Sequence, residues 1–75
     1  MLLSDLKIQE KAEIKAIRVS GRQGRRLLDL GFIPGTIIKA IRKSPLGDPV
    51  AYRIKGTVLA LRKEETDLIE IRRIE

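Results

Sequence analysis

The stretch that decides the fold reads Leu27-Leu28-Asp29-Leu30-Gly31-Phe32-Ile33-Pro34-Gly35-Thr36. Its three leucines predict a helix with an apolar face that ends at Gly31, because glycine readily adopts the left-handed conformation that closes many helices. Pro34-Gly35 predicts a type II turn, since proline presets the first central residue and glycine allows a positive φ at the second. A strand rich in β-branched residues begins at Thr36.

On the N-terminal side, residues 13–19 predict a strand whose apolar alternation changes phase between Ala16 and Ile17, which indicates a bulge. Ser20 and Gln23 fit a capping box at the start of the helix. On the C-terminal side, strands are predicted over residues 36–43, 50–55, 57–61 and 68–74. Lys55-Gly56 predicts a tight hairpin turn, and residues 62–67 leave room for a single helical turn.

Five short strands with one inserted helix predict a small, mostly antiparallel β-barrel, because curling the sheet protects its edges. The SH3-like barrel is the first interpretation, over one domain that spans residues 1–75. The alternative is an OB-fold, which also has five strands and one helix. Its helix usually lies between the third and fourth strands, later than the pattern here.

The composition narrows the chemistry. The 75 residues include no cysteine and no histidine, which excludes disulfides, thiolate sites and imidazole ligands. The net charge is +6, and residues 14–63 hold twelve Lys or Arg against two Asp, a local charge of +10. Such a basic region suits an acidic protein surface, nucleic acid or an anionic membrane, or simply a solvated exterior. No signal peptide and no membrane-spanning run is predicted, so a soluble protein is expected.

Four segments in register resemble one family. The core at residues 26–36 resembles the LxxLGxxPGT motif of the FeoA family. Gly47-Asp48-Pro49, Gly56 and Leu59-Ala60-Leu61-Arg62 resemble its second half, and Glu64-Glu65 before Ile69 resembles its closing pattern. Thr66 replaces the more usual alanine. The resemblance covers about residues 4 to 74.

The resemblance implies a small cytoplasmic SH3-like protein of bacterial ferrous iron uptake. It implies a partner, the FeoB-type membrane permease with its cytosolic GTP-binding domain. The residues themselves offer no histidine base and no phosphate-binding loop, so neither an enzymatic role nor a cofactor is expected. The resemblance leaves open whether the protein activates, inhibits or stabilises that permease, and in which oligomeric state it acts.

The predicted partner-binding residues lie on the helix. They are Arg22, Arg25, Arg26 and Leu28. Leu28 is adjacent to Leu27, about 100° around the helix, so only one of the two can face a narrow core. Leu27, Leu30 and Ile33 are predicted to pack the helix onto the barrel, while Gly31, Pro34, Gly35 and Gly56 set turns. Arg25 and Asp29 have the spacing of an ordinary i,i+4 ion pair.

Other chemistries receive weaker support. Glu64, Glu65 and Asp67 are the nearest approach to a carboxylate cluster and are interpreted as solvated charges, so no metal site is expected. The alternative function is a basic barrel that binds RNA or DNA through phosphates. Tyr52 is its one candidate for base stacking, because Phe32 is predicted to be core.

Overall fold

The computed structural model describes residues 1–18 and 21–74 of the chain. Its elements are η1 (Leu3–Asp5), β1 (Lys11–Ile17), α1 (Gly21–Asp29), β2 (Ile37–Lys43), β3 (Val50–Ile54), β4 (Thr57–Leu61), α2 (Lys63–Thr66) and β5 (Ile69–Ile74). The five strands, the inserted helix and the single turn of α2 follow the predicted order. The capping box falls on Ser20 and the Gln23 side chain, which lie outside what is described.

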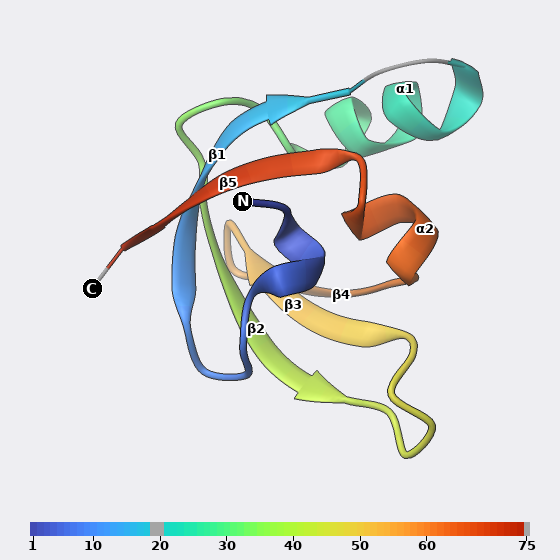
Figure 1. Cartoon of the computed structure of the whole chain (residues 1–75). Helices are drawn as coiled ribbons and strands as arrows, with labels where there is room; N and C mark the ends of the chain where they lie inside the picture. Colours follow the sequence, from blue (N-terminus) through green and yellow to red (C-terminus); the bar gives the residue numbers. More distant parts are fainter. Residues whose placement is uncertain (19–20, 75) are drawn as a thin grey trace.

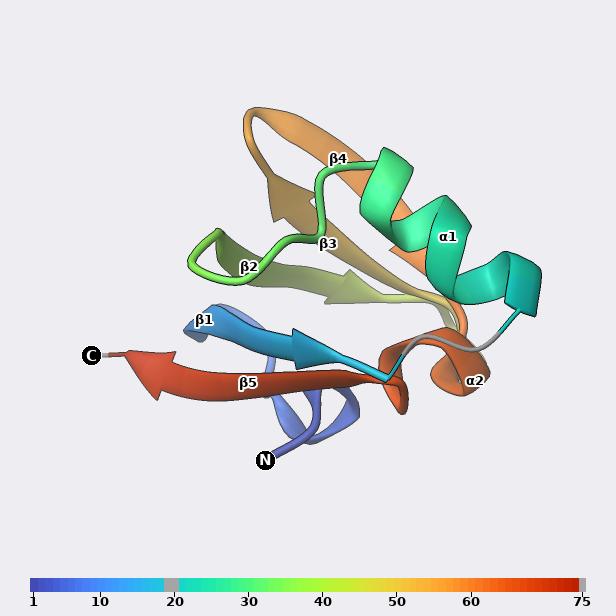
Figure 2. The ribbon, with the colours of Figure 1, turned by 90° about the horizontal axis from the view of Figure 1, so that it is seen from above.

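The five strands form one antiparallel sheet in the order β4-β3-β2-β1-β5. The sheet curls strongly, and α1, α2 and the N-terminal segment surround its open side (Figure 1). From above, the strands succeed one another in that order (Figure 2). The β1–β5 register shifts between Ile14 and Ala16, so the bulge lies slightly before the predicted position. This irregularity bends β1, which a small curled sheet requires.

The end of α1 closes with a Schellman motif. The Phe32 N–H donates to the Leu27 carbonyl and the Gly31 N–H to the Leu28 carbonyl, both at 3.0 Å. Gly31 has φ +96°, a conformation that costs a side-chain-bearing residue more than glycine. These bonds satisfy helix carbonyls that would otherwise lack donors. The helix therefore ends where the sequence predicts.

The turn that follows joins the helix to β1 as well as to β2. The Thr36 N–H donates to the Ile33 carbonyl at 3.1 Å, and Gly35 has φ +92°, which confirms the type II turn. The Gly35 N–H donates to the Ile14 carbonyl at 2.8 Å, and the Ile14 N–H donates to the Thr36 carbonyl at 2.9 Å. The junction between α1 and β2 is thus fastened to the middle of β1.

The second predicted turn is also present. Lys55 and Gly56, with φ of 50° and 78°, form the two-residue connection between β3 and β4. Positive φ at both positions is the type I′ geometry, whose twist matches that of the flanking strands. Gly56 is the residue there that adopts such a φ with least strain.

The core is almost wholly aliphatic, and the helix contributes less to it than predicted. Leu27 and Phe32 are fully buried, whereas Leu30 is 38% and Ile33 43% exposed. The prediction that Leu30 and Ile33 pack the helix onto the barrel was wrong. Leu30 lies about 60° around the helix from Leu27, on its flank, and Ile33 belongs to the outward-facing turn. Two side chains of the N-terminal segment fill the core in place of Leu30 and Ile33. They are Leu3 and Leu6, which are 0% and 5% exposed.

We expect Leu27→Ala to lower the free energy of unfolding by about 2–5 kcal/mol, because a fully buried leucine leaves a cavity. The matched variant Leu28→Ala, one residue along the same helix, removes a side chain that is 40% exposed and should cost less than about 1 kcal/mol. Urea unfolding followed by circular dichroism measures both values. Equal losses would contradict this assignment of the helix faces.

Candidate partner-binding surface

The outward side of α1 carries a stripe of exposed side chains. Arg22, Arg25 and Leu28 are exposed and follow one another at intervals of three residues, so they lie along one side of the helix. Within the described residues, neither Arg22 nor Arg25 has a carboxylate within 4 Å. The anticipated ion pair between Arg25 and Asp29 is therefore not formed. Both guanidinium groups keep their donors for other contacts, and an acidic surface is the natural acceptor.

Arg26 has a different role, because its guanidinium donates to Glu65 of α2. Glu65 is only 7% exposed, and its other carboxylate oxygen accepts from the Arg62 N–H at 3.1 Å. This carboxylate thus caps the single turn of α2 and holds α1 against it. The interpretation of Glu65 as a solvated charge was wrong, since the contact joins residues 39 positions apart. Arg26 also cannot be counted with the unpaired arginines.

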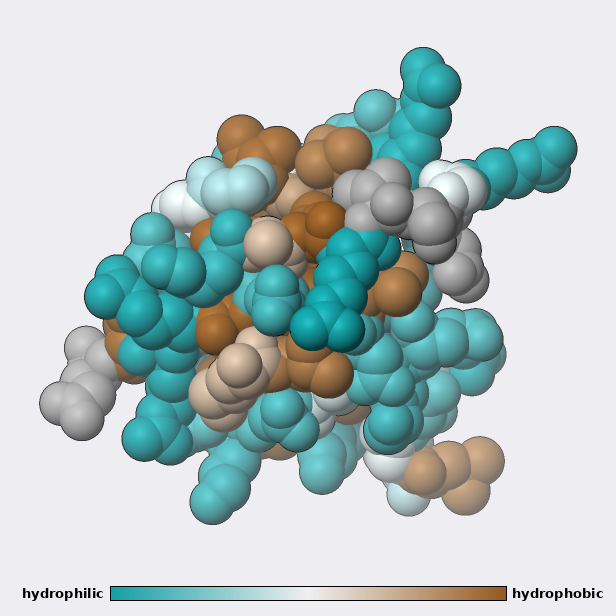
Figure 3. All heavy atoms as spheres, turned by 45° about the horizontal axis from the view of Figure 1, so that its top comes forward, coloured by the Kyte–Doolittle hydropathy of each residue, from teal (hydrophilic) through white to brown (hydrophobic). Residues whose placement is uncertain are grey.

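Apolar side chains are exposed beside this stripe. Leu28, Leu30 and Ile33 are each about 40% exposed at the C-terminal end of α1 and the turn after it. The Lys55 side chain lies close to Gly31, where an added Cβ would be 3.5 Å from its Cδ. Figure 3 shows several groups of exposed hydrophobic atoms on the face that carries α1, surrounded by hydrophilic atoms. An apolar anchor with a charged surround is typical of the core and rim of protein interfaces.

The two aromatic residues lie inside the barrel. Phe32 is fully buried and Tyr52 is 2% exposed, so neither ring is available for stacking on a nucleic-acid base. Tyr52 was the one candidate for that role, and its burial removes the stacking form of the nucleic-acid interpretation. Burial, followed by the negative charge of Asp48, raises the pKa of Tyr52 to about 12.

The carboxylates of the α2 region do not converge on one point. In the described part of the chain, no group of three or more His, Cys, Asp or Glu side chains is arranged to hold a metal ion. Glu65 binds Arg26, and Asp67 accepts from the Lys63 ammonium at 3.0 Å. Hydrogen bonds from Ser4 and Lys63 lower the pKa of Asp67.

None of the helices within residues 1–18 and 21–74 is long and apolar enough to span a bilayer.

Comparison with known proteins places this arrangement in a family. Residues 1–73 match the family model of the FeoA domain. The chain belongs to the FeoA family. One curated FeoA relative, from Porphyromonas gingivalis (strain ATCC BAA-308 / W83), is an Fe(2+) transport protein A/Fe(2+) transporter FeoB fusion protein. It is 37% identical over 71 residues, which cover 95% of this chain but only 8% of the fusion protein.

Solved FeoA structures share the fold. Iron(II) transport protein A from Clostridium thermocellum is 40% identical, with a TM-score of 0.92 over 99% of this chain and 46% of that one. FeoA of Stenotrophomonas maltophilia, complexed with zinc and described as a prokaryotic SH3 domain protein, is 28% identical. Its TM-score is 0.85 over 96% of this chain and 89% of that one. The predicted family and the predicted SH3-like fold are confirmed. The FeoA family is linked to ferrous iron transport and is not a known family of enzymes.

Replacing Glu65 should weaken the attachment of α1 to α2. We expect Glu65→Ala to lower the free energy of unfolding by about 1–2 kcal/mol, through loss of the cap and of a partly exposed ion pair. The neighbouring Glu64 is exposed, so Glu64→Ala should change stability by no more than about 0.5 kcal/mol. Chemical denaturation of both variants tests this, and a larger loss in Glu64→Ala would refute the role given to Glu65.

Stability at high pH should depend on Tyr52. Its pKa is about 12 in the folded protein and 10.0 ordinarily, so its contribution is fully present below pH 10 and is lost as the pH rises through 12. Between pH 9 and 11.5, wild type should lose about 2 kcal/mol more unfolding free energy than Tyr52→Phe. Lysine titration affects both proteins alike. Denaturant unfolding of both proteins at the two pH values measures this difference. Equal losses of unfolding free energy in the two proteins would show that folding does not raise the pKa of the Tyr52 phenol.

Proposed function

We propose that this FeoA-family protein is a non-enzymatic regulator of ferrous iron transport that docks on the cytosolic GTP-binding domain of a FeoB-type permease. The observation that carries the proposal is the Porphyromonas gingivalis relative, in which a region 37% identical to this chain belongs to one polypeptide with FeoB. Fusion of two modules raises their effective concentration to the millimolar range for short linkers, which suits modules that work by contact. In this role the protein would act in the cytoplasm, as one unit over residues 1–75.

The docking surface is the stripe of Arg22, Arg25 and Leu28 on α1. The two unpaired guanidinium groups would bind carboxylates of the partner, and bidentate geometry would orient the complex. Leu28 would bury its exposed side chain in an apolar depression of the partner. Arg26 contributes indirectly, because its bond to Glu65 fixes the helix that presents the other three.

Regulation requires that the protein bind two states of the permease with different affinity. A module that binds both states equally shifts neither, however tightly it binds. The GTP-bound and GDP-bound forms of the partner are the natural pair of states. Since the chain would add no chemistry of its own, nucleotide hydrolysis would remain with the partner.

The test is binding of the full chain to its permease in lipid nanodiscs and, separately, to the isolated GTP-binding domain. Calorimetry with GDP and with a non-hydrolysable GTP analogue, each at two salt concentrations, gives the affinities. Saturable binding that differs between nucleotides is the expected result. Absence of binding to the full-length permease in every nucleotide state would reject the proposal.

Variants locate the surface. Arg25→Glu should weaken binding about tenfold or more, because it places like charges across the interface, and Leu28→Ser should weaken it by a similar factor. Arg42→Glu is the matched control, since Arg42 is an exposed arginine on β2 and has no ion pair within the described residues. Equal affinities for the three variants would move the docking surface away from α1.

A further inference from the structure

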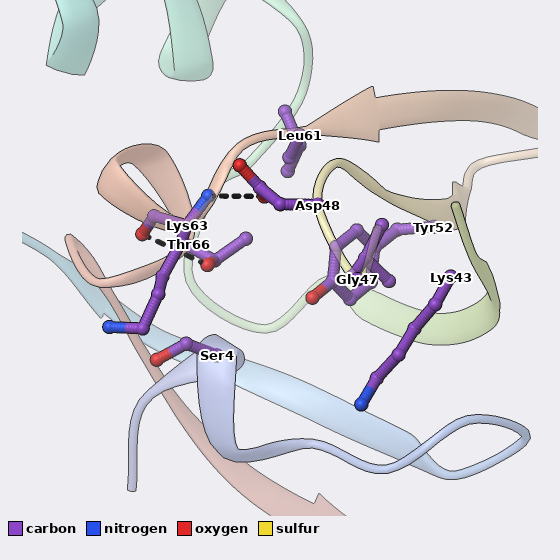
Figure 4. A pocket seen from close by; sticks show the side chains of 9 residues that line it. Ser4, Lys43, Gly47, Asp48, Tyr52, Leu61, Lys63 and Thr66 are labelled. Atoms are coloured by element: carbon purple, nitrogen blue, oxygen red, sulfur yellow. Dashed lines mark hydrogen bonds between the residues drawn. The ribbon is translucent and has the colours of Figure 1, made fainter. Parts of the chain in front are cut away.

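A cavity lies on a different part of the molecule, between η1, the β2–β3 connection and α2 (Figure 4). Its volume is about 210 Å³. None of the described side chains that line it belongs to α1, so it is separate from the proposed docking surface. Its polar lining comes from Ser4, Lys43, Asp48, Tyr52, Lys63 and Thr66.

The Tyr52 hydroxyl is a hydrogen-bond donor at the wall of this cavity. The residue is 98% buried, and among the described residues the hydroxyl takes part in no hydrogen bond. Among the described residues, the sealed side-chain oxygen without a partner is that of Ser44, so the Tyr52 hydroxyl is open to the cavity and can donate to a molecule there. The Tyr52 ring lines the cavity, with its oxygen directed into it (Figure 4). The phenol is protonated at neutral pH already at its ordinary pKa of 10.0, which burial raises further, so it can donate.

The other hydroxyl groups of the cavity face acceptors of the protein. The Thr66 hydroxyl donates to the Lys63 carbonyl at 3.1 Å, and the Ser4 hydroxyl lowers the pKa of the Asp67 carboxyl. Asp48 is occupied as well. One of its oxygens accepts from the Lys63 N–H at 2.9 Å, and the other lies 3.6 Å from the Arg62 guanidinium.

The charges of the lining favour an anion. Two lysines and one aspartate give it a net charge of +1. Lys63 shares its ammonium with Asp67, whereas Lys43 has no carboxylate within 4 Å in the part of the chain that the structure describes. Lys43 and Tyr52 therefore present the two unused donors. Val50 and Leu61 supply apolar wall beside them.

We propose that this cavity binds a small monocarboxylate. Its carboxylate accepts hydrogen bonds from the Tyr52 hydroxyl and the Lys43 ammonium, and its short alkyl chain packs against Val50 and Leu61. A ligand with a single negative charge neutralises the net charge of +1 of the lining. A dianion would carry one charge more than the lining neutralises, and Asp48 would repel it. The volume suits a ligand of a few carbon atoms, below the size of most drug-like ligands.

The test uses the full chain labelled with nitrogen-15 and titrated with butyrate. Butyramide serves as the uncharged isostere and inorganic phosphate as the anion without a carboxylate. We expect saturable amide shifts around the cavity with butyrate, with a Kd on the order of 1–10 mM for so small a ligand. Butyramide and phosphate should bind at least about tenfold more weakly, the factor of one charge-assisted hydrogen bond.

Substitutions of Tyr52 and Lys43 test whether these two donors bind the butyrate carboxylate. Tyr52→Phe keeps the ring and removes the hydroxyl, and Lys43→Met keeps the chain length and removes the charge, so each should raise the Kd about tenfold. Lys11→Met, on β1 and outside the cavity, should leave it unchanged. Non-saturating shifts, shifts spread over other surfaces, or unchanged affinity in Tyr52→Phe would overturn the proposal. These outcomes are independent of permease binding, so the two proposals fail separately.

Discussion

The hydrogen bonds between the α1–β2 junction and β1 are the constraint on which the rest of the structure depends. Ile14 is the pivot, because its carbonyl accepts from Gly35 and its N–H donates to Thr36. This contact sets where the helix returns to the sheet. It brings Leu27 and Phe32 into the interior and leaves Leu28, Leu30 and Ile33 outside. The glycines of the FeoA motif therefore decide which side of a short helix faces outward.

The short turn α2 joins two parts of the molecule that are far apart in sequence. Through Glu65 it holds α1, and through Lys63 and Thr66 it forms part of the cavity beside η1. The N-terminal segment completes the arrangement, because Leu3 and Leu6 fill core volume that the helix leaves free. A chain of 75 residues can build an aliphatic core with little helix only if such segments contribute.

Local sequence patterns predicted the elements of this fold well, and contacts between distant residues poorly. Pro34-Gly35 and Lys55-Gly56 specify their turns through backbone angles, and β2 and β3 show the alternation of half-buried strands. The exposure of Leu30 depends on where the barrel lies relative to the helix, which no local pattern encodes. The same holds for Glu65, whose partner Arg26 is 39 residues away, and for the cavity around Tyr52. The exposure of the Leu28 side chain could be predicted, because two adjacent leucines cannot both face the core from one side of a helix.

The burial of Tyr52 has a consequence for spectroscopy. The chain contains one tyrosine and no tryptophan, so its near-ultraviolet absorption and emission arise almost entirely from a single ring. That ring lies in the core with its hydroxyl at the cavity wall. The protein thus carries an intrinsic optical probe of one interior site, undiluted by surface chromophores. Any event that alters the surroundings of that hydroxyl changes the whole aromatic signal of the molecule.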